Sequence, residues 1–186
     1  MNKPDQVVKK SDLIDGNGQC LKIETFPIGL VVSRFNDEIT QALQEGAIER
    51  LKERGFAEAQ IQVIEVPGAV EIPLAVTWLL QTKNTPQAVI ALGAVIRGDT
   101  THYDYVCQQV SYGCQRVALD SQVPVIFGIL TTENETQAWE RVGGTQGHKG
   151  REAADTAISM QQLRHKLWEE KRASESISNQ KECSYS

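Results

Sequence analysis

Short apolar runs alternate along this chain with stretches whose apolar residues recur every three or four positions. The first run, Ile28–Ser33, is followed from Asp37 by a pattern typical of an amphipathic helix. The alternation continues with apolar runs at 61–66, 88–96 and 123–131 and helical patterns at 71–81, 104–119, 133–141 and 149–168. Repeated strand–helix units favour a parallel sheet with right-handed connections. We therefore predict an α/β fold, a three-layer αβα sandwich around a central parallel four-stranded sheet.

The length of 186 residues is enough for one domain with a substantial core, which we place at residues 20–172. Residues 1–19 are polar and are predicted to form a flexible N-terminal segment. Residues 173–186 contain five serines and few apolar groups, so they are predicted to be a disordered tail.

Composition excludes several classes of function. A net charge of −5 gives no basic surface for nucleic acid, and no apolar run approaches the roughly 20 residues that span a membrane. The first ten residues lack the apolar core of a secretion signal, so we expect a cytoplasmic protein. The four cysteines form no Cys-x-x-Cys pair and only three histidines are present, so we expect no metal site.

Residues suited to chemistry follow the predicted strands, and parallel sheets bind ligands beyond the carboxyl ends of their strands. The loop 97–102 joins one strand to a helix, where Gly98 frees the backbone and helix N–H groups can bind phosphate. His102 lies in the same loop, and imidazole changes charge near neutral pH, so it is the candidate for proton transfer. The alternative is a turn with a solvated histidine.

Two further strand ends add candidates, each with a simpler explanation. In the segment 66–73, the amides of Ala69 and Val70 can face a ligand and Glu71 can accept hydrogen bonds from hydroxyl groups. Glu71 is equally suited to the N-terminus of a helix. Phe35 can stack on a planar ring or can belong to the core.

Arg141 and Lys149 flank a glycine-rich stretch, where both can bind a phosphate or can be solvated surface charges. A flavodoxin-like binding or signalling module without catalysis would explain the alternation and the phosphate-suited loop equally well. That alternative gives no role to His102 or to the two cations.

Several stretches, in this order and spacing, resemble the lumazine synthase family, the 6,7-dimethyl-8-ribityllumazine synthases of riboflavin biosynthesis. They are Ser33–Asn36, Val66–Pro73, Leu92–Tyr105, Pro124–Thr131, and Gln137–Arg141 followed by Gly147–Ala154. The resemblance implies a flavodoxin-like sandwich with an additional N-terminal strand. It also implies a transferase that condenses 5-amino-6-(D-ribitylamino)uracil with 3,4-dihydroxy-2-butanone 4-phosphate in the penultimate step of the pathway. Phosphate and water are released, and no metal or organic cofactor is used.

The resemblance implies a role for each candidate residue. Proton transfer falls to His102, with Asp104 as its orienting partner. The implied substrate-binding residues are Phe35 for the pyrimidine, Ala69, Val70 and Glu71 for the ribityl chain, Val95 and Ile96 for the ring pocket, Gly98, Asp99, Thr100 and Arg141 for the phosphate, and Phe127 and Lys149 to complete the pocket. Phe127, Arg141 and Lys149 are expected to come from the neighbouring subunit.

Two residues depart from the family pattern, because Thr101 stands where Pro is usual and His148 where Asn is common. The resemblance implies a homo-oligomer, a pentamer either alone or within a closed icosahedral shell of pentamers, with riboflavin synthase as a candidate protein partner. No insertion separates Arg141 from Lys149, a feature the resemblance associates with shell-forming members. A shell-forming structural role is the remaining alternative, and it is compatible with catalysis.

Overall fold

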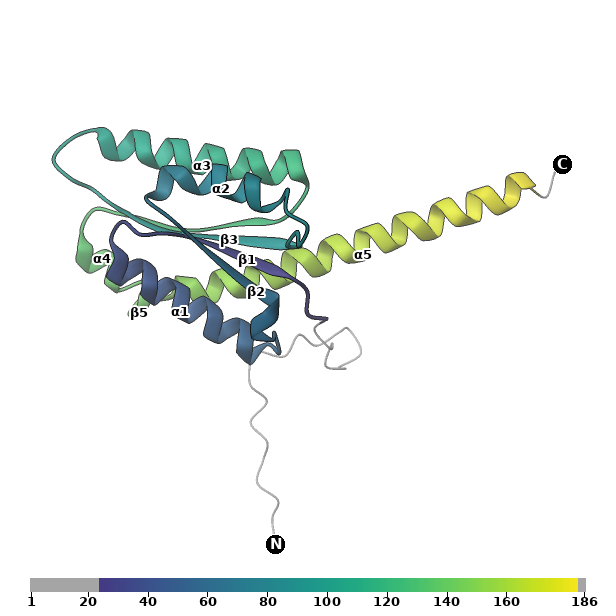
Figure 1. Cartoon of the computed structure of the whole chain (residues 1–186), viewed down its shortest axis with the longest axis horizontal. Helices are drawn as coiled ribbons and strands as arrows, with labels where there is room; N and C mark the ends of the chain where they lie inside the picture. The colour runs from purple at the N-terminus through teal and green to yellow at the C-terminus, as the bar shows by residue number, and fades with distance from the viewer. Residues whose placement is uncertain (1–23, 184–186) are drawn as a thin grey trace, which may run out of the picture.

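The computed structural model describes residues 24–183 of the chain (Figure 1). The flexible segment expected at 1–19, and any part of the expected N-terminal strand that precedes Glu24, lie outside this range. Four strands form one parallel sheet in the order β2-β1-β3-β4. They are β1 (Ile28–Ser33), β2 (Ile61–Val66), β3 (Ala88–Ile96) and β4 (Val125–Thr132).

Helices cover both faces of the sheet (Figure 1). On one face lie α1 (Asp37–Glu53) and α5 (Lys149–Cys183), and on the other lie α2 (Ile72–Leu79) and α3 (His102–Ser121). Each face of the sheet has its own apolar core against its helices. The predicted αβα sandwich with a parallel four-stranded sheet is therefore confirmed.

The central strands are apolar along their whole length because both of their faces are covered. All six residues of β1 are buried, and Leu30 pairs with Val63 of β2 on one side and Ile90 of β3 on the other. β4 lies at the edge of the sheet and is less protected, so Phe127 in its middle is 43% exposed.

Short elements join these layers. They are η1 (Glu58–Gln60), η2 (Ala69–Glu71), α4 (Glu135–Trp139) and the antiparallel pair β5 (Val142–Gly144) and β6 (Gly147–His148). The sequence does not predict the β5–β6 hairpin, because its glycines suggest an irregular connection. Gly143 and Gly147 instead adopt φ angles of 113° and 76°, which glycine reaches without strain and which allow the tight turn.

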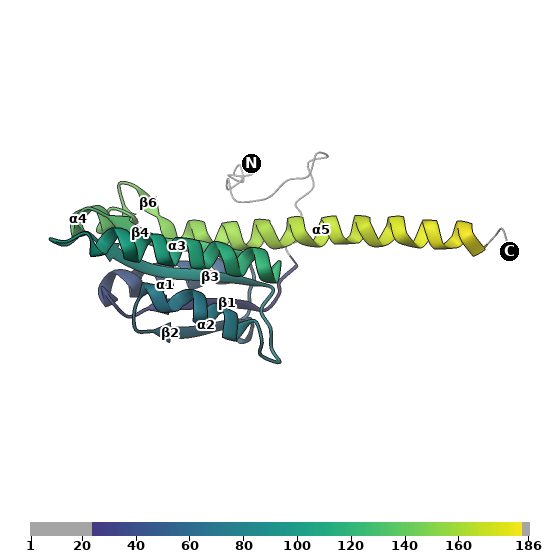
Figure 2. The same ribbon diagram turned by 90° about the horizontal axis from the view of Figure 1, so that it is seen from above.

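α5 extends beyond the sheet and reaches Cys183 (Figure 2). It thus includes most of the segment 173–186, for which the sequence predicts disorder. Neither Gly nor Pro occurs between Arg151 and Cys183, so nothing in the covalent structure interrupts the helix. The domain boundaries at 20 and 172 stay a prediction.

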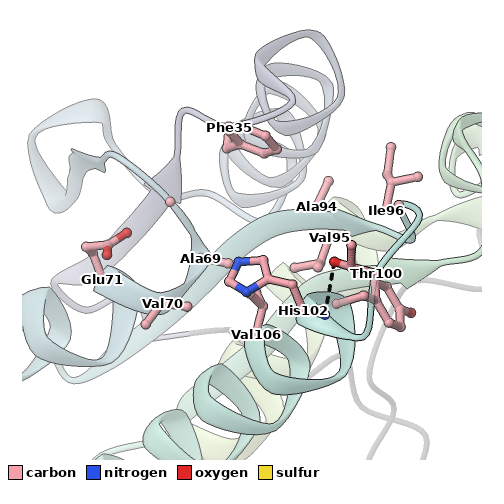
Figure 3. Close-up of a pocket in the computed structure, with 13 residues that line it drawn as sticks. Phe35, Ala69, Val70, Glu71, Ala94, Val95, Ile96, Thr100, His102 and Val106 are labelled. Atoms are coloured by element: carbon pink, nitrogen blue, oxygen red, sulfur yellow. Dashed lines mark hydrogen bonds between the residues drawn. The ribbon is translucent and has the colours of Figure 1, made fainter.

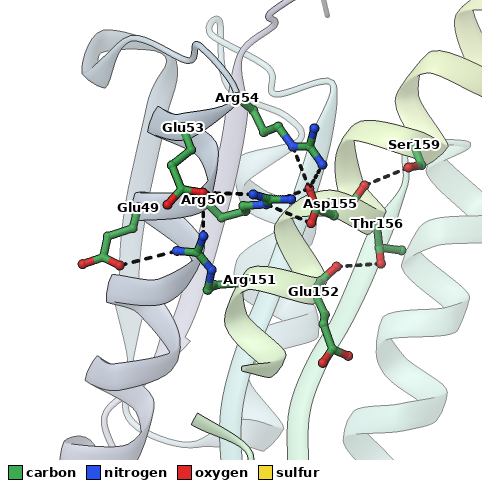
Figure 4. Close-up of polar contacts among 9 residues, drawn as sticks. All are labelled: Glu49, Arg50, Glu53, Arg54, Arg151, Glu152, Asp155, Thr156 and Ser159. Atoms are coloured by element: carbon green, nitrogen blue, oxygen red, sulfur yellow. Dashed lines mark hydrogen bonds and ion pairs between the residues drawn. The ribbon is translucent and has the colours of Figure 1, made fainter. Parts of the chain in front are cut away.

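A group of charged side chains ties α1 to the first turns of α5 (Figure 4). The Asp155 carboxylate accepts hydrogen bonds from Arg50 Nε at 2.9 Å and Arg54 Nε at 2.9 Å. Glu53 pairs with Arg50 and with Arg151, and these hydrogen bonds lower the pKa of its carboxyl group to about 2. We call these five residues the α1–α5 ion-pair cluster. It fixes the start of α5, which carries Lys149.

Candidate active site

A cavity of about 350 Å³ opens at the carboxyl ends of β1 and β3, between η2 and the start of α3 (Figure 3). Its volume suits a small-molecule ligand. Nine of the residues singled out in the sequence line it: Phe35, Ala69, Val70, Glu71, Val95, Ile96, Gly98, Thr100 and His102. The structure thus brings together residues from three segments that are far apart in the chain.

Phe35 is held at the rim of the cavity by its neighbours. The Asn36 side-chain amide donates a hydrogen bond of 2.8 Å to the carbonyl of Ala94 on β3, and Arg34 N–H donates to the carbonyl of Val66 at 2.8 Å. Asn36 has a φ of 59°, a left-handed conformation that asparagine tolerates better than most residues. Phe35 itself is 71% exposed, so the alternative of a core residue is wrong and its ring is available to a ligand.

The η2 segment forms the wall opposite α3. Gly68 is extended, and a Cβ added to it would lie 2.9 Å from Glu71 Oε2, so the Glu71 carboxylate folds back over this glycine. Glu71 occupies the position just before α2, yet its side chain makes no capping hydrogen bond there. The carboxylate therefore remains able to accept hydrogen bonds from a polar ligand in the cavity.

His102 is the first residue of α3, two residues earlier than the helix start that the sequence predicts. Its backbone N–H donates to Thr100 Oγ1 at 3.3 Å, and its ring projects over the cavity toward Ala69 (Figure 3). The expected orienting partner, Asp104, is engaged elsewhere, since its Oδ1 accepts a hydrogen bond of 3.1 Å from Arg97. The pairing of Asp104 with His102 is therefore wrong for this structure.

Arg97 holds the phosphate-suited loop in place through contacts with three neighbouring side chains. Besides Asp104 it contacts Glu133 at 2.7 Å, and its guanidinium lies over the Tyr103 ring at 4.1 Å from the ring centre. These contacts join the end of β3, the start of α3 and the end of β4. They leave Gly98 and Thr100 at the cavity, whereas Asp99 is exposed and is not part of the cavity wall.

Four residues that the sequence does not single out also line the cavity: Gly68, Ala94, Tyr103 and Val106. Burial raises the pKa of Tyr103, so its phenol remains protonated at neutral pH. Val106 lies one helical turn after His102, and i,i+4 spacing along a helix that starts at His102 would have found it.

Besides Asp99, three predicted site residues lie outside this cavity. Phe127, Arg141 and Lys149 line a separate groove of about 490 Å³ along the edge strand β4. The backbone N–H of Lys149 donates to the carbonyl of Arg141 at 2.8 Å, which holds the two cationic residues next to each other. Arg141 also donates to the Gln137 carbonyl, and the Lys149 ammonium pairs with Glu152 at 2.7 Å. The candidate residues thus form two groups, one in the cavity and one in the groove.

Within residues 24–183, the structure contains no group of three His, Cys, Asp or Glu side chains arranged to hold a metal ion. No helix in the same range has the length and apolar character needed to cross a membrane.

Comparison with known proteins links both groups of residues to one family. A family model described as 6,7-dimethyl-8-ribityllumazine synthase matches residues 25–165, which include the cavity and the groove. Two proteins named 6,7-dimethyl-8-ribityllumazine synthase, from Coxiella burnetii strains CbuG_Q212 and RSA 493 / Nine Mile phase I, are each 53% identical over 139 residues. Those matches cover 75% of this chain and 91% of each relative. The protein of the same name from strain Dugway 5J108-111 is 52% identical over the same length.

Proposed function

This chain belongs to the 6,7-dimethyl-8-ribityllumazine synthase family, and we propose that it builds each active site from two subunits. It is a transferase of riboflavin biosynthesis that condenses 5-amino-6-(D-ribitylamino)uracil with 3,4-dihydroxy-2-butanone 4-phosphate. The observation that carries the proposal is the separation of the candidate residues into the cavity group and the groove group.

The cavity group is suited to the two substrates. The exposed Phe35 ring can stack on the pyrimidine, and the η2 backbone with the Glu71 carboxylate offers hydrogen-bond partners to the ribityl hydroxyls. Gly98 and Thr100 lie where the first N–H groups of α3 point, which suits the phosphate of the butanone. Holding both substrates in one cavity makes the condensation effectively intramolecular.

His102 is our candidate for the proton transfers. The 5-amino group attacks the ketone to give an imine with loss of water, phosphate is eliminated, and the ribityl-bearing amine then closes the ring on the remaining carbonyl with loss of a second water. Each step moves a proton to or from nitrogen, oxygen or carbon, and a positioned imidazole accelerates such steps by roughly 10²–10⁴-fold. The His102 ring lines the cavity beside the phosphate-suited loop, next to the space that the reacting atoms would occupy.

The groove group supplies what the cavity lacks. Among the residues that the structure places around the cavity there is no Arg or Lys, although the substrate phosphate carries about −1.5 to −2 charges at neutral pH. Arg141 and Lys149 provide two cations, and Phe127 provides a partly exposed aromatic ring beside them. Docked over a neighbour's cavity, the groove would neutralise the phosphate and exclude water.

We propose a cyclic homo-oligomer, most simply a pentamer, because a ring repeats one head-to-tail contact so that every cavity meets a groove. The β5–β6 hairpin between the two cations has only Thr145 and Gln146 in its turn, which supports assembly of such rings into a closed shell. Sedimentation velocity of the purified protein distinguishes a ring from a shell. Riboflavin synthase as a partner and a cytoplasmic location stay predictions.

Co-expression of His102→Ala with Arg141→Ala tests the shared site. Rings of either single variant carry a lesion in every site and should be nearly inactive in a lumazine fluorescence assay. In randomly mixed rings, about a quarter of the sites combine an intact His102 with an intact Arg141 from the adjacent chain, so about a quarter of wild-type activity should return.

The matched control is co-expression of His102→Ala with Phe35→Ala, two lesions on the same cavity. Mixing these chains creates no intact site, so activity should stay at the level of the single variants. If the Arg141 mixture recovers no more activity than this control, with mixing verified by native mass spectrometry, the two groups serve one chain and the proposal fails.

A further inference from the structure

The His148 ring at the end of β6 is seated between two glycines. A Cβ added to Gly46, in the middle of α1, would overlap the ring, and one added to Gly143 on β5 would lie 3.7 Å from its Cδ2. His148 Nδ1 is buried, and no group within the described part of the chain forms a hydrogen bond with it. The ring is therefore held by its fit against the two backbones rather than by a directed polar contact.

Charged groups surround this seat on both helices. Burial lowers the pKa of His148, and the nearby Arg151 lowers it further. The carboxylates of Glu49 on α1 and Glu152 on α5 act in the opposite direction but do not outweigh these two effects. The ring is thus uncharged at neutral pH, as its insertion between the backbones of α1 and β5 requires.

The presence of glycine at position 46 is explained by its contact with the His148 ring. Glycine in a helix interior is less favourable than alanine, and Gly46 is buried with no positive φ that would require it. The contact that forbids a side chain there is the one with the His148 ring. One turn earlier on α1, the carbonyl of Leu43 would overlap any side chain at Gly150 of α5. The start of α5 thus rests directly on the backbone of α1.

We infer that His148 is a positioning residue. By packing against α1, its ring holds Lys149 and Arg141 in the geometry that binds the substrate phosphate. Lys149 follows His148 directly, and its N–H is hydrogen-bonded to the Arg141 carbonyl at 2.8 Å. Movement of the ring would therefore move both cations together. This inference rests on the proposed function, because it concerns the groove group.

The seat is tested by a thermodynamic cycle of Gly46→Ala and His148→Ala, followed by thermal unfolding. In the wild-type background Gly46→Ala should lower Tm by about 2–8 °C, because the new methyl overlaps the ring. In the His148→Ala background the same change should raise Tm by about 2–4 °C, because the clash is gone and alanine is the better helix former. Equal changes of Tm on Gly46→Ala in both backgrounds would show that the His148 ring does not pack against Gly46, and would overturn the inference.

The positioning role is tested by steady-state kinetics of His148→Ala, which removes atoms and adds none. KM for the phosphorylated butanone should rise about tenfold, while KM for the pyrimidine changes by less than about twofold, because only the cations are displaced. His148→Asn keeps a planar group against Gly46, so KM for the phosphorylated substrate should stay within about threefold of wild type.

Arg141→Ala is the reference variant that distinguishes failure of the positioning role of His148 from failure of the proposed function. If it raises KM for the phosphorylated butanone and His148→Ala does not, the positioning role is wrong and the proposed function stands. If neither variant raises that KM, the phosphate-binding role of the groove fails, and the positioning role fails with it. The Tm cycle reports on the seat itself in either case.

Discussion

The Asp155 carboxylate is the centre of the α1–α5 ion-pair cluster, and Asp155→Asn removes its charge with almost no change of shape. The side chains of its partners Arg50 and Arg54 are only 17% and 14% exposed, whereas Asp155 is 36% exposed. Exposed ion pairs contribute about 0–1 kcal/mol, and removing one partner from a buried pair costs about 3–5 kcal/mol. This site lies between those limits, so we expect a loss of about 2–3 kcal/mol in the free energy of unfolding.

A loss of that size corresponds to a fall in Tm of about 4–12 °C for a chain of this length. Circular dichroism melts at neutral pH and one fixed protein concentration measure it, since oligomers unfold in a concentration-dependent way. The matched control is Glu49→Gln, which also removes one negative charge from the α1–α5 surface. Glu49 is 71% exposed and lies 3.6 Å from Arg151, so its Tm should change by less than about 2 °C.

Two results would refute this reasoning. If Asp155→Asn and Glu49→Gln shift Tm equally, the burial of the two arginines does not decide the strength of the cluster. If 1 M salt abolishes the difference between Asp155→Asn and wild type, the pairs behave as screened surface charges.

Three further results are expected. His102→Ala should lower kcat by about one to three orders of magnitude without dissolving the assembly, measured by lumazine formation and sedimentation; full kcat would remove His102 from the catalytic machinery. Burial lowers the pKa of His148 from 6.5, so near that pH the unfolded chain binds more protons than the folded chain. The free energy of unfolding is therefore highest above pH 6.5 and decreases as the pH falls below it. Between about pH 7.5 and 5.5, Tm should therefore fall further for wild type than for His148→Asn, and parallel curves would contradict this. Deleting residues 173–186 should leave kcat unchanged and shift Tm by less than about 2 °C, because α5 projects away from the sheet there (Figure 2); a larger drop would mean that the tail packs on the body or on another subunit.

The central strands β1 and β3 are predictable from sequence because burial on both faces makes them apolar, and the edge strands β2 and β4, although partly exposed, keep enough apolar residues to be recognised. β1, β2 and β3 have the predicted bounds, and β4 shifts by two residues at its start. The elements that sequence did not predict depend on tertiary contacts. The β5–β6 hairpin is fixed by the hydrogen bond of Gln146 N–H to the Glu140 carbonyl and by the seat of His148 on α1, neither of which has a local signal.

The candidate site shows the same division. Strand-end position was enough to select Phe35, Glu71 and His102, because parallel strands bring their carboxyl ends to one edge whatever their loops contain. Side-chain pairing was not predictable, since the sequence places Asp104 two residues after His102 and seven after Arg97 and does not show which of them it contacts. Its actual partner, Arg97, is determined by the path of the loop across the end of β3.

The two groups of residues cannot meet within one subunit without breaking the contacts described above. Arg141 and Lys149 are joined to each other by a backbone hydrogen bond, and His148 anchors them to the α1 face of the sheet. His102 begins α3, which covers the opposite face. Bringing the cations to His102 within one subunit would require the His148 ring to leave Gly46. In the proposed oligomer, a second subunit that presents its own β4 edge to the cavity would bring the same cations to the phosphate and leave these contacts intact.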